Sequence, residues 1–269
     1  MMARVLVDGQ AGDRVSVLDR GLGYGDGLFE TIRFLGADAP LWSRHMHRLE
    51  DGCRRLGLLM PSTGTLLAEA RAVSRELAQS VVRITLTRGI GARGYKPPSK
   101  PQSSRIVAAF DVPPRDEAAQ AEGIRVRLCS MRLGSQPVLA GLKHLNRLEQ
   151  VLARAEWDDP AIAEGLLCDA DGLAISATAA NLFAVFAGVL ATPAIDRCGV
   201  AGVARAQVLA AWPQVRVRRI PLDELRGADE LFLSSSVRGI LPVRELDGSA
   251  FAVGPVARAL QSHWRELGF

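Results

Sequence analysis

The chain has 269 residues, of which 48% are hydrophobic and 23% charged, and its formal net charge is +4. It has no apolar run near the roughly 18 residues of a membrane span, and its positive charge is spread out instead of gathered in basic runs with interleaved aromatics. These features disfavour membrane insertion and nucleic-acid binding. The length indicates a globular protein of one large domain or two domains of ordinary size. The positive net charge suits a small-molecule anionic substrate.

The N-terminal residues and the cysteines indicate the compartment. The N-terminus lacks the apolar core and cleavage site of a signal peptide, so we expect a cytoplasmic protein. The cysteines are widely spaced, without histidines at metal-ligand spacing; they are Cys53, Cys129, Cys168 and Cys198. We therefore expect reduced, mostly buried thiols, and neither a disulfide framework nor a metal site.

Residues 1–111 are predicted to form a small α/β domain. Alternating apolar residues and turn signals predict strands at 4–7, 15–17, 81–87 and 105–110. Two helices are predicted, one capped by Ser43 and ending near Leu58, the other at about 65–79. The segment 19–33 is predicted to be a glycine-dense loop that runs into a strand, and the glycines alone could explain a tight loop.

Residues 112–122, rich in proline and charge, are predicted to link this domain to a larger one at 123–269. The larger domain has strands predicted at 124–129, 165–168, 215–220 and 230–233, and helices at about 203–212 and 255–267. Gly199 and Gly202 precede the first of these helices, whose N-terminal N–H groups and positive dipole end suit a phosphate. The alternative is that two glycines merely enter a helix.

The segment 141–152 contains a lysine in unusual surroundings. Its apolar residues follow helical spacing, which predicts a helix with one buried face and Lys143 off that face at the start. Only three of the 33 basic residues are lysines, so a lysine here indicates an amine that can lose its proton. On a helix, Arg147 would lower the pKa of that amine, and a neutral amine can form a Schiff base. The alternative is a solvated lysine.

Two motifs carry a resemblance to a known family. Lys143 to Val151 reads Lys-His-Leu-Asn-Arg-Leu-Glu-Gln-Val and resembles the lysine segment of aminodeoxychorismate lyases, which are fold-type IV pyridoxal-phosphate enzymes. Ala180-Asn181-Leu182-Phe183, followed by Leu190-Ala191-Thr192 and by Val200 to Arg205, is similar to the signature of that fold type. The resemblance implies a two-domain α/β (α+β) fold of the D-amino acid aminotransferase-like type, pyridoxal 5'-phosphate between the domains, and a homodimer.

The resemblance also implies the cofactor-binding residues. Lys143 would carry the cofactor and then transfer a proton, and Arg48, in His45-x-x-Arg48-Leu49, would bind its phosphate. Arg147 stands near the position where related aminotransferases have a tyrosine that contacts the phenolic oxygen of the cofactor. The full set is Arg48, Lys143, Arg147, Ser176, Val203, Ala204 and Ser236.

The implied substrate-binding residues lie in the first domain. The run Tyr-Gly-Asp-Gly-Leu-Phe-Glu-Thr is similar to a segment of the family whose aromatic residue, here Tyr24, lines the substrate pocket. The run from Arg88 through Arg93 to Tyr95 resembles a loop of the lyases, and two arginines with a tyrosine on a glycine hinge could bind carboxylates. The alternative is a mobile basic loop.

One position departs from the family pattern. The signature normally has a glutamate five residues before the asparagine, and its carboxylate pairs with the ring nitrogen of the cofactor; here the residue is Ser176. A serine supplies no charge to keep that nitrogen protonated, so the ring would be a weaker electron sink. We expect this to harm transamination more than an elimination that creates an aromatic ring.

The implied activity is therefore that of the lyases in folate synthesis. They convert 4-amino-4-deoxychorismate to 4-aminobenzoate and pyruvate by proton removal at the amine-bearing carbon and elimination. Two alternatives stay open: a D-amino acid or branched-chain aminotransferase of the same fold, and a non-catalytic binding relative.

Overall fold

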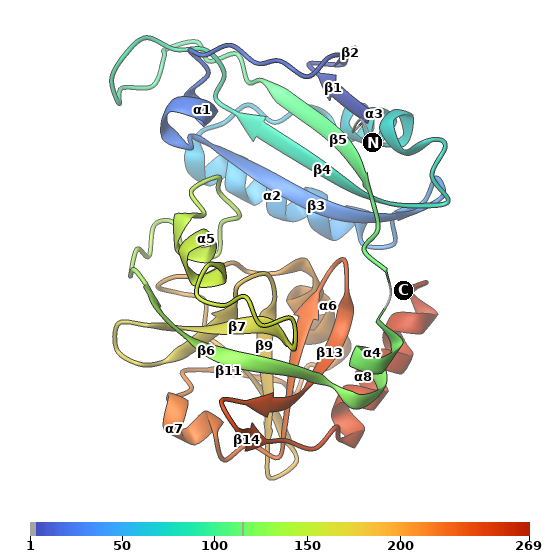
Figure 1. Cartoon of the computed structure of the whole chain (residues 1–269). Helices are drawn as coiled ribbons and strands as arrows, with labels where there is room; N and C mark the ends of the chain where they lie inside the picture. Colours follow the sequence, from blue (N-terminus) through green and yellow to red (C-terminus); the bar gives the residue numbers. More distant parts are fainter. Residues whose placement is uncertain (1–3, 115) are drawn as a thin grey trace. The chain divides into compact units, whose positions relative to one another are not determined.

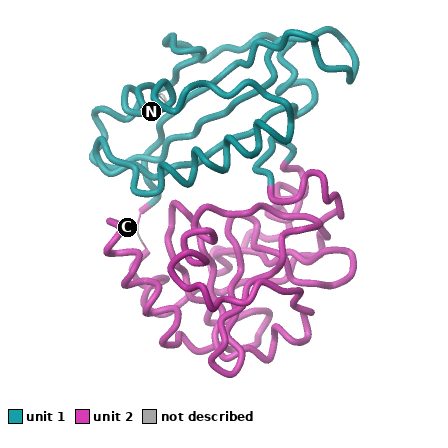
Figure 2. The backbone as a smooth tube through the Cα atoms, turned by 180° about the vertical axis from the view of Figure 1, so that it is seen from behind, with its two compact units in different colours: residues 1–113, 142–146 teal, residues 114–141, 147–269 magenta. Residues whose placement is uncertain are grey.

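The computed structural model describes residues 4–114 and 116–269, which form two compact units. Unit 1 comprises Met1–Pro113 and Leu142–Asn146, and unit 2 comprises Pro114–Gly141 and Arg147–Phe269 (Figure 2). The chain thus leaves unit 2 briefly and returns to unit 1 with the segment that carries Lys143. The sequence prediction instead placed this lysine in the domain 123–269, and the predicted linker 112–122 contains helix α4, Glu117–Glu122.

Unit 1 is a five-stranded antiparallel sheet with helices packed on it (Figure 1). The sheet order is β2-β1-β5-β4-β3, so β3 is an edge strand. The strands are β1 Arg4–Val7, β2 Gln10–Ala11, β3 Gly27–Leu35, β4 Gln79–Thr87 and β5 Arg105–Asp111. The helices are α1 Arg20–Tyr24, α2 Trp42–Leu56 and α3 Thr63–Ser74. Alternate residues of β3, among them Leu28, Ile32 and Phe34, are buried, as are Met46 and Leu49 of α2.

Unit 2 is built on a nine-stranded mixed sheet. Because β8 pairs with both β7 and β9, the path β9-β12-β13-β6-β7-β8 closes on itself. The strands are β6 Ile124–Leu133, β7 Ile162–Asp169, β8 Ala174–Ala177, β9 Asn181–Phe186, β10 Val189–Pro193, β11 Arg216–Arg218, β12 Glu230–Ser235, β13 Gly239–Leu246 and β14 Ser249–Ala250. The remaining helices are α5 Leu148–Arg154, α6 Val203–Ala211, α7 Leu222–Leu225 and α8 Pro255–Glu266.

The helix predicted for the lysine segment is wrong in both extent and orientation. Helix α5 begins only at Leu148, so the residues from Leu142 to Asn146 are not helical. The predicted buried face is largely exposed, because Leu148, Val151 and Leu152 are 74%, 59% and 57% exposed. The apolar residues do follow helical spacing, but the side chains of Leu148, Val151 and Leu152 are exposed to solvent.

Smaller differences concern element ends. Helix α2 begins at Trp42 without a side-chain cap, so Ser43 is not its N-cap, and α3 is capped by Ser62 and ends earlier than predicted. The residues 15–17 form no strand, and part of the glycine-dense loop is the short helix α1. All four cysteines are buried and unpaired, as predicted. Within residues 4–114 and 116–269, no helix has the length and apolar character needed to cross a membrane.

Candidate functional site

The segment Leu142–Asn146 lies along the edge strand β3. The backbone N–H of Phe29 donates to Lys143 O at 2.9 Å, and the N–H of Leu145 donates to Gly27 O at 3.0 Å. The Asn146 side chain donates to Gly25 O at 3.1 Å. Backbone pairing with β3 therefore positions Lys143, and its Nζ lies 4.3 Å from the centroid of the Phe29 ring.

The predicted effect of Arg147 on Lys143 rested on both residues being one turn apart on a helix, and that geometry is absent because helix α5 begins only at Leu148. Arg147 is instead the residue that precedes α5, and it is partly buried. Burial lowers the pKa of its own guanidinium, although Glu149 opposes that shift. Its cofactor role stays a prediction.

Glu30, His45 and Arg48 form a buried polar triad in unit 1. Arg48 donates from Nε and Nη2 to the two carboxylate oxygens of Glu30, at 2.8 and 2.5 Å. His45 Nδ1 lies 2.6 Å from Glu30 Oε2. Because a carboxylate only accepts, Nδ1 must carry the proton, and the buried Nε2 has no hydrogen-bond partner among the described residues.

The charges of this triad follow from its environment. Burial alone would raise the pKa of Glu30, but the Arg48 guanidinium and the hydrogen bond from His45 lower it to about 2. Burial lowers the pKa of His45 against the opposing effect of Glu30, so the imidazole is neutral at pH 7. The predicted phosphate ligand Arg48 is thus already held by a carboxylate on one side.

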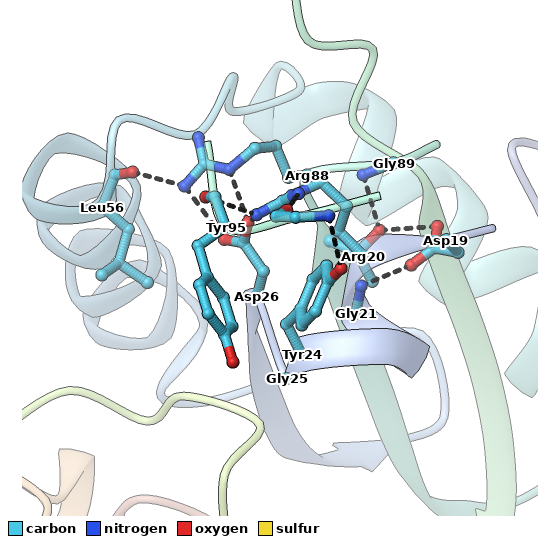
Figure 3. A network of polar contacts seen from close by, with 12 residues as sticks. Asp19, Arg20, Gly21, Tyr24, Gly25, Asp26, Leu56, Arg88, Gly89 and Tyr95 are labelled. Atoms are coloured by element: carbon cyan, nitrogen blue, oxygen red, sulfur yellow. Dashed lines mark hydrogen bonds and ion pairs between the residues drawn. The ribbon is translucent and has the colours of Figure 1, made fainter. Parts of the chain in front are cut away.

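The predicted substrate arginine Arg88 is buried in a second network, with Arg20 and Asp26 (Figure 3). Arg88 donates to both oxygens of Asp26, from Nε at 2.7 Å and from Nη2 at 2.9 Å, and also to the carbonyls of Leu56 and Gly57. Burial would raise the pKa of Asp26, but Arg88 and Arg20 lower it. These contacts commit four of the five guanidinium N–H donors of Arg88 to the protein, which argues against the predicted substrate role; that role stays a prediction.

Arg20 connects this network to the loop that carries Arg93 and Tyr95. Its Nη1 and Nη2 donate to the carbonyls of Gly94 and Tyr95, at 2.8 and 3.0 Å (Figure 3). The Tyr24 hydroxyl accepts from Gly94 N at 3.0 Å, and the rings of Tyr24 and Tyr95 lie 5.6 Å apart. Tyr24, at the end of α1, thus contacts the loop that carries Arg93 and Tyr95, and both of these residues are exposed.

In unit 2, Asn181 organises the turn that leads into α6. Its Nδ2 donates to Val200 O at 2.8 Å, and its Oδ1 would lie only 1.9 Å from a Cβ added to Gly202. A side chain at position 202 is therefore excluded. Gly202 is the N-cap of α6 and supplies no side-chain hydrogen bond, so the helix start at Val203 and Ala204 is uncapped. Such a terminus suits a phosphate.

Ser176 lies on β8 beside this turn, paired across the sheet with Asn181. Its side chain is buried. Ser236 lies in the turn between β12 and β13, where Ser235 Oγ accepts from the N–H groups of Val237 and Arg238, at 3.3 and 3.4 Å. These contacts shape the turn; they leave the predicted roles of Ser176 and Ser236 as predictions.

Sequence reasoning missed Phe29, Glu30 and Asp26. Phe29 is the aromatic ring beside the lysine amine, and the predicted role of Tyr24 in the substrate pocket stays a prediction. Glu30 could have been found, because it falls on the buried side of an alternating strand, between Leu28 and Ile32, where a carboxylate needs a partner. Asp26 had no comparable signal, since its partner Arg88 is 62 residues away in the chain.

Comparisons with known proteins agree with this architecture. The family described as Amino-transferase class IV matches residues 27–246. Aminodeoxychorismate lyase of Vibrio harveyi is 34% identical over 96% of this chain and 98% of its own length. A putative branched-chain-amino-acid aminotransferase of Methanocaldococcus jannaschii is 32% identical over 94% of this chain and 91% of its own length.

A solved structure gives the same result at the level of the fold. The crystal structure of 4-amino-4-deoxychorismate lyase from Pseudomonas aeruginosa matches with a TM-score of 0.93 and 44% identity, covering 97% of this chain and 98% of that one. The predicted α/β fold of fold-type IV enzymes is thereby confirmed. The chain belongs to the amino-transferase class IV family.

Proposed function

We propose that this chain is a pyridoxal-phosphate-dependent aminodeoxychorismate lyase, which converts 4-amino-4-deoxychorismate to 4-aminobenzoate and pyruvate for folate synthesis. The observation that carries the proposal is the position of Lys143. Its amine is fixed beside Phe29 by backbone pairing, within a segment that matches the lysine segment of the lyases. Near full-length similarity to two proteins named as lyases supports the same activity.

The residues present fit pyridoxal phosphate. The uncapped start of α6 offers the amides of Val203 and Ala204 to a phosphate, and the close approach at Gly202 keeps that turn free of side chains. Arg48 would contribute through the guanidinium edge that does not face Glu30. Ser236 would add a hydroxyl. Arg147 would contact the phenolic oxygen, and Ser176 would offer the ring nitrogen a neutral hydrogen bond.

When bound, the cofactor supplies the electron sink that makes the proton on the amine-bearing carbon of the substrate removable. Lys143 Nζ would first hold the cofactor and then, once the substrate amine has replaced it, take that proton. Arg93 and Tyr95 would bind a carboxylate of the substrate, and Tyr24 would hold their loop in place. Expulsion of pyruvate from the neighbouring carbon then leaves the aromatic ring of 4-aminobenzoate.

An aminotransferase is the second candidate, because a relative at 32% identity carries that name. Ser176 argues against it, since transamination depends more strongly on a protonated ring nitrogen than elimination does. The two activities separate in one assay. Pyruvate formed from aminodeoxychorismate without a keto-acid acceptor is the lyase reaction, and amino-group transfer to 2-oxoglutarate is the aminotransferase reaction.

The proposal includes a homodimer in the cytoplasm. Leu148, Val151 and Leu152 form an exposed apolar stripe on α5, and burial of this stripe against a second copy would account for it. Light scattering during gel filtration would give the mass of a dimer for the wild type and of a monomer for Val151→Asp. A wild-type monomer would contradict this part of the proposal.

The activity is tested with the protein purified in pyridoxal phosphate. We expect pyruvate release from aminodeoxychorismate, and borohydride treatment should attach the cofactor to Lys143, located by mass spectrometry. Lys143→Ala should abolish both results. Absence of labelling together with absence of turnover would favour a non-catalytic binding protein.

A further inference from the structure

Glu164 is a buried carboxylate at one end of the core of unit 2. It lies near the start of β7 and is 3% exposed. Because side chains alternate along a strand, Glu164 shares a face of β7 with Leu166 and Cys168, which belong to the core cluster enclosed by the closed path of strands. A carboxylate in such surroundings needs polar partners. These partners come from two turns that are far apart in the sequence.

Arg238, in the turn between β12 and β13, supplies the counterion. Its Nη2 donates to Glu164 Oε2 at 2.6 Å, and the two residues form an ion pair. The carbonyl oxygen of Arg238 accepts from Gln120 Nε2 at 3.2 Å, which attaches the same turn to α4. Arg238 follows Ser236 by two residues, so these contacts hold the turn that carries Ser236.

Thr178, in the turn between β8 and β9, binds the other oxygen of the carboxylate. Its hydroxyl donates to Glu164 Oε1, and its backbone N–H donates to Gly165 O at 3.0 Å. This turn lies between Ser176 on β8 and Asn181 on β9. The carboxylate of Glu164 therefore contacts both turns of unit 2 next to the residues that the proposed function assigns to the cofactor.

Glu230 shows that a buried carboxylate of this unit can have a different use. It is 4% exposed and lies at the start of β12, at the opposite end of that strand from the turn that carries Ser236. Its two oxygens accept from the backbone N–H groups of Val256 and Ala257, at 3.2 and 3.0 Å, so it caps α8. Glu164 differs because both of its contacts come from side chains in turns beside the proposed cofactor site.

We propose that Glu164 is a positioning residue for the cofactor. It binds Arg238 with one oxygen and Thr178 with the other, and thereby sets where Ser236 and Ser176 stand relative to each other. This inference rests on the proposed function and deepens it. Arg238 holds the turn of the phosphate contact, and Thr178 holds the turn beside the ring nitrogen. Because binding groups must be held in place by their surroundings, displacement of one turn weakens one contact and leaves the other.

The test compares Glu164→Met, which keeps the length of the side chain and removes both contacts, with Arg238→Met and Thr178→Val, which each remove one. Glu230→Met is the matched control for the loss of a buried carboxylate. The full chain is freed of cofactor, and the Kd values of pyridoxal phosphate and of pyridoxal, which lacks the phosphate, are measured by titration. The absorption spectrum of the bound cofactor reports on the surroundings of the ring.

We expect Arg238→Met to raise the Kd of pyridoxal phosphate by about 10- to 100-fold, the range for hydrogen bonds to a charged group, while the Kd of pyridoxal changes little. Thr178→Val should leave the ratio of the two Kd values unchanged and shift the absorption spectrum. Glu164→Met should show both effects. Glu230→Met should lose stability in a thermal melt but show neither effect.

Wild-type Kd values in Glu164→Met would overturn the inference. Equal rises in both Kd values would do the same, because they indicate a general loss of structure, and so would the same change of ratio in Glu230→Met. Arg238 has a side chain that is 33% exposed, so Arg238→Met keeps the test available if Glu164→Met does not fold.

Failure of the proposed function is distinguishable. A wild-type chain that binds neither compound would refute the cofactor and leave the positioning of the turn to be measured by amide hydrogen exchange. The N–H groups of Val237 and Arg238 donate to Ser235 Oγ within this turn. Faster exchange of these two amides in Glu164→Met than in Glu230→Met would support the contact as the device that orders the turn, and equal exchange would overturn it.

Discussion

Arg48 meets both oxygens of the Glu30 carboxylate, at 2.8 and 2.5 Å, in a place where Glu30 is 1% exposed. Removing one member of such a pair leaves the other charge buried and uncompensated. We expect Glu30→Gln to lower the free energy of unfolding at pH 7 by about 3–5 kcal/mol, measured by denaturant titration. Glu50→Gln, at an exposed position of helix α2, which also carries Arg48, should cost less than about 0.5 kcal/mol. Similar losses in the two variants would contradict this account.

The same carboxylate makes stability depend on pH. Its pKa in the folded chain is about 2, against 4.5 as the ordinary value, so its stabilising effect is complete above pH 4.5 and disappears as the pH falls towards 2. His45 acts in the same direction, because its lowered pKa means that the unfolded chain takes up a proton first as the pH falls below 6.5. The difference in unfolding free energy between wild type and Glu30→Gln should therefore shrink between pH 4.5 and 2. A constant difference would exclude the ion pair as its cause.

Gly25 lies where α1 ends and the lysine segment passes. Its φ angle is +65°, and an added Cβ would lie 2.4 Å from Asn146 Oδ1. We expect Gly25→Ala to destabilise the protein by about 1–3 kcal/mol and to lower kcat, because Asn146 and with it Lys143 must shift. Gly23→Ala is the matched control, since nothing lies within 4 Å of its added Cβ. If Gly25→Ala lowered stability but left kcat unchanged, the lysine would not depend on this contact.

Arg88 and Arg93, only five residues apart in sequence, should respond in opposite ways. Arg88→Met removes a buried partner of Asp26 and should lower the free energy of unfolding by about 3–5 kcal/mol. Arg93→Met, in the exposed part of the loop, should leave stability within about 0.5 kcal/mol and raise KM for aminodeoxychorismate. Thermal melts of both variants measure the change in stability, and steady-state kinetics measure the change in KM. A stable Arg88→Met protein with raised KM would restore the original sequence prediction.

Substitution of Ser176 tests whether a negative charge beside the ring nitrogen of the cofactor favours transamination. Ser176→Glu would place a carboxylate where the family signature has one, and we expect transamination of D-alanine to rise about tenfold relative to the lyase reaction. Ser176→Gln has nearly the same size without the charge and should show no such rise. Single-turnover formation of pyridoxamine phosphate measures the change. Equal behaviour of the two variants would mean that charge at this position does not control the reaction.

The fold was largely predictable where the signal is local. Alternation located the strand 81–87 within two residues of β4, and the glycines before Val203 located the start of α6. The lysine segment was misjudged because its apolar spacing mimics a helix, whereas its conformation is set by pairing with β3, more than a hundred residues earlier. The contacts of Arg88 were not predictable for the same reason, since a local motif reveals two arginines but not the distant Asp26 that binds one of them.

The return of Leu142–Asn146 to unit 1 makes that unit discontinuous in the chain. A fragment ending at Pro113 would contain Phe29, Glu30 and Arg48 but not the lysine beside them, and β3 would expose an unpaired edge. During synthesis, this edge stays open until residue 146 has left the ribosome, so Lys143 joins the N-terminal sheet late. The two units therefore cannot be separated by a single cut, and domain exchange between relatives would have to move the lysine segment together with the N-terminal sheet.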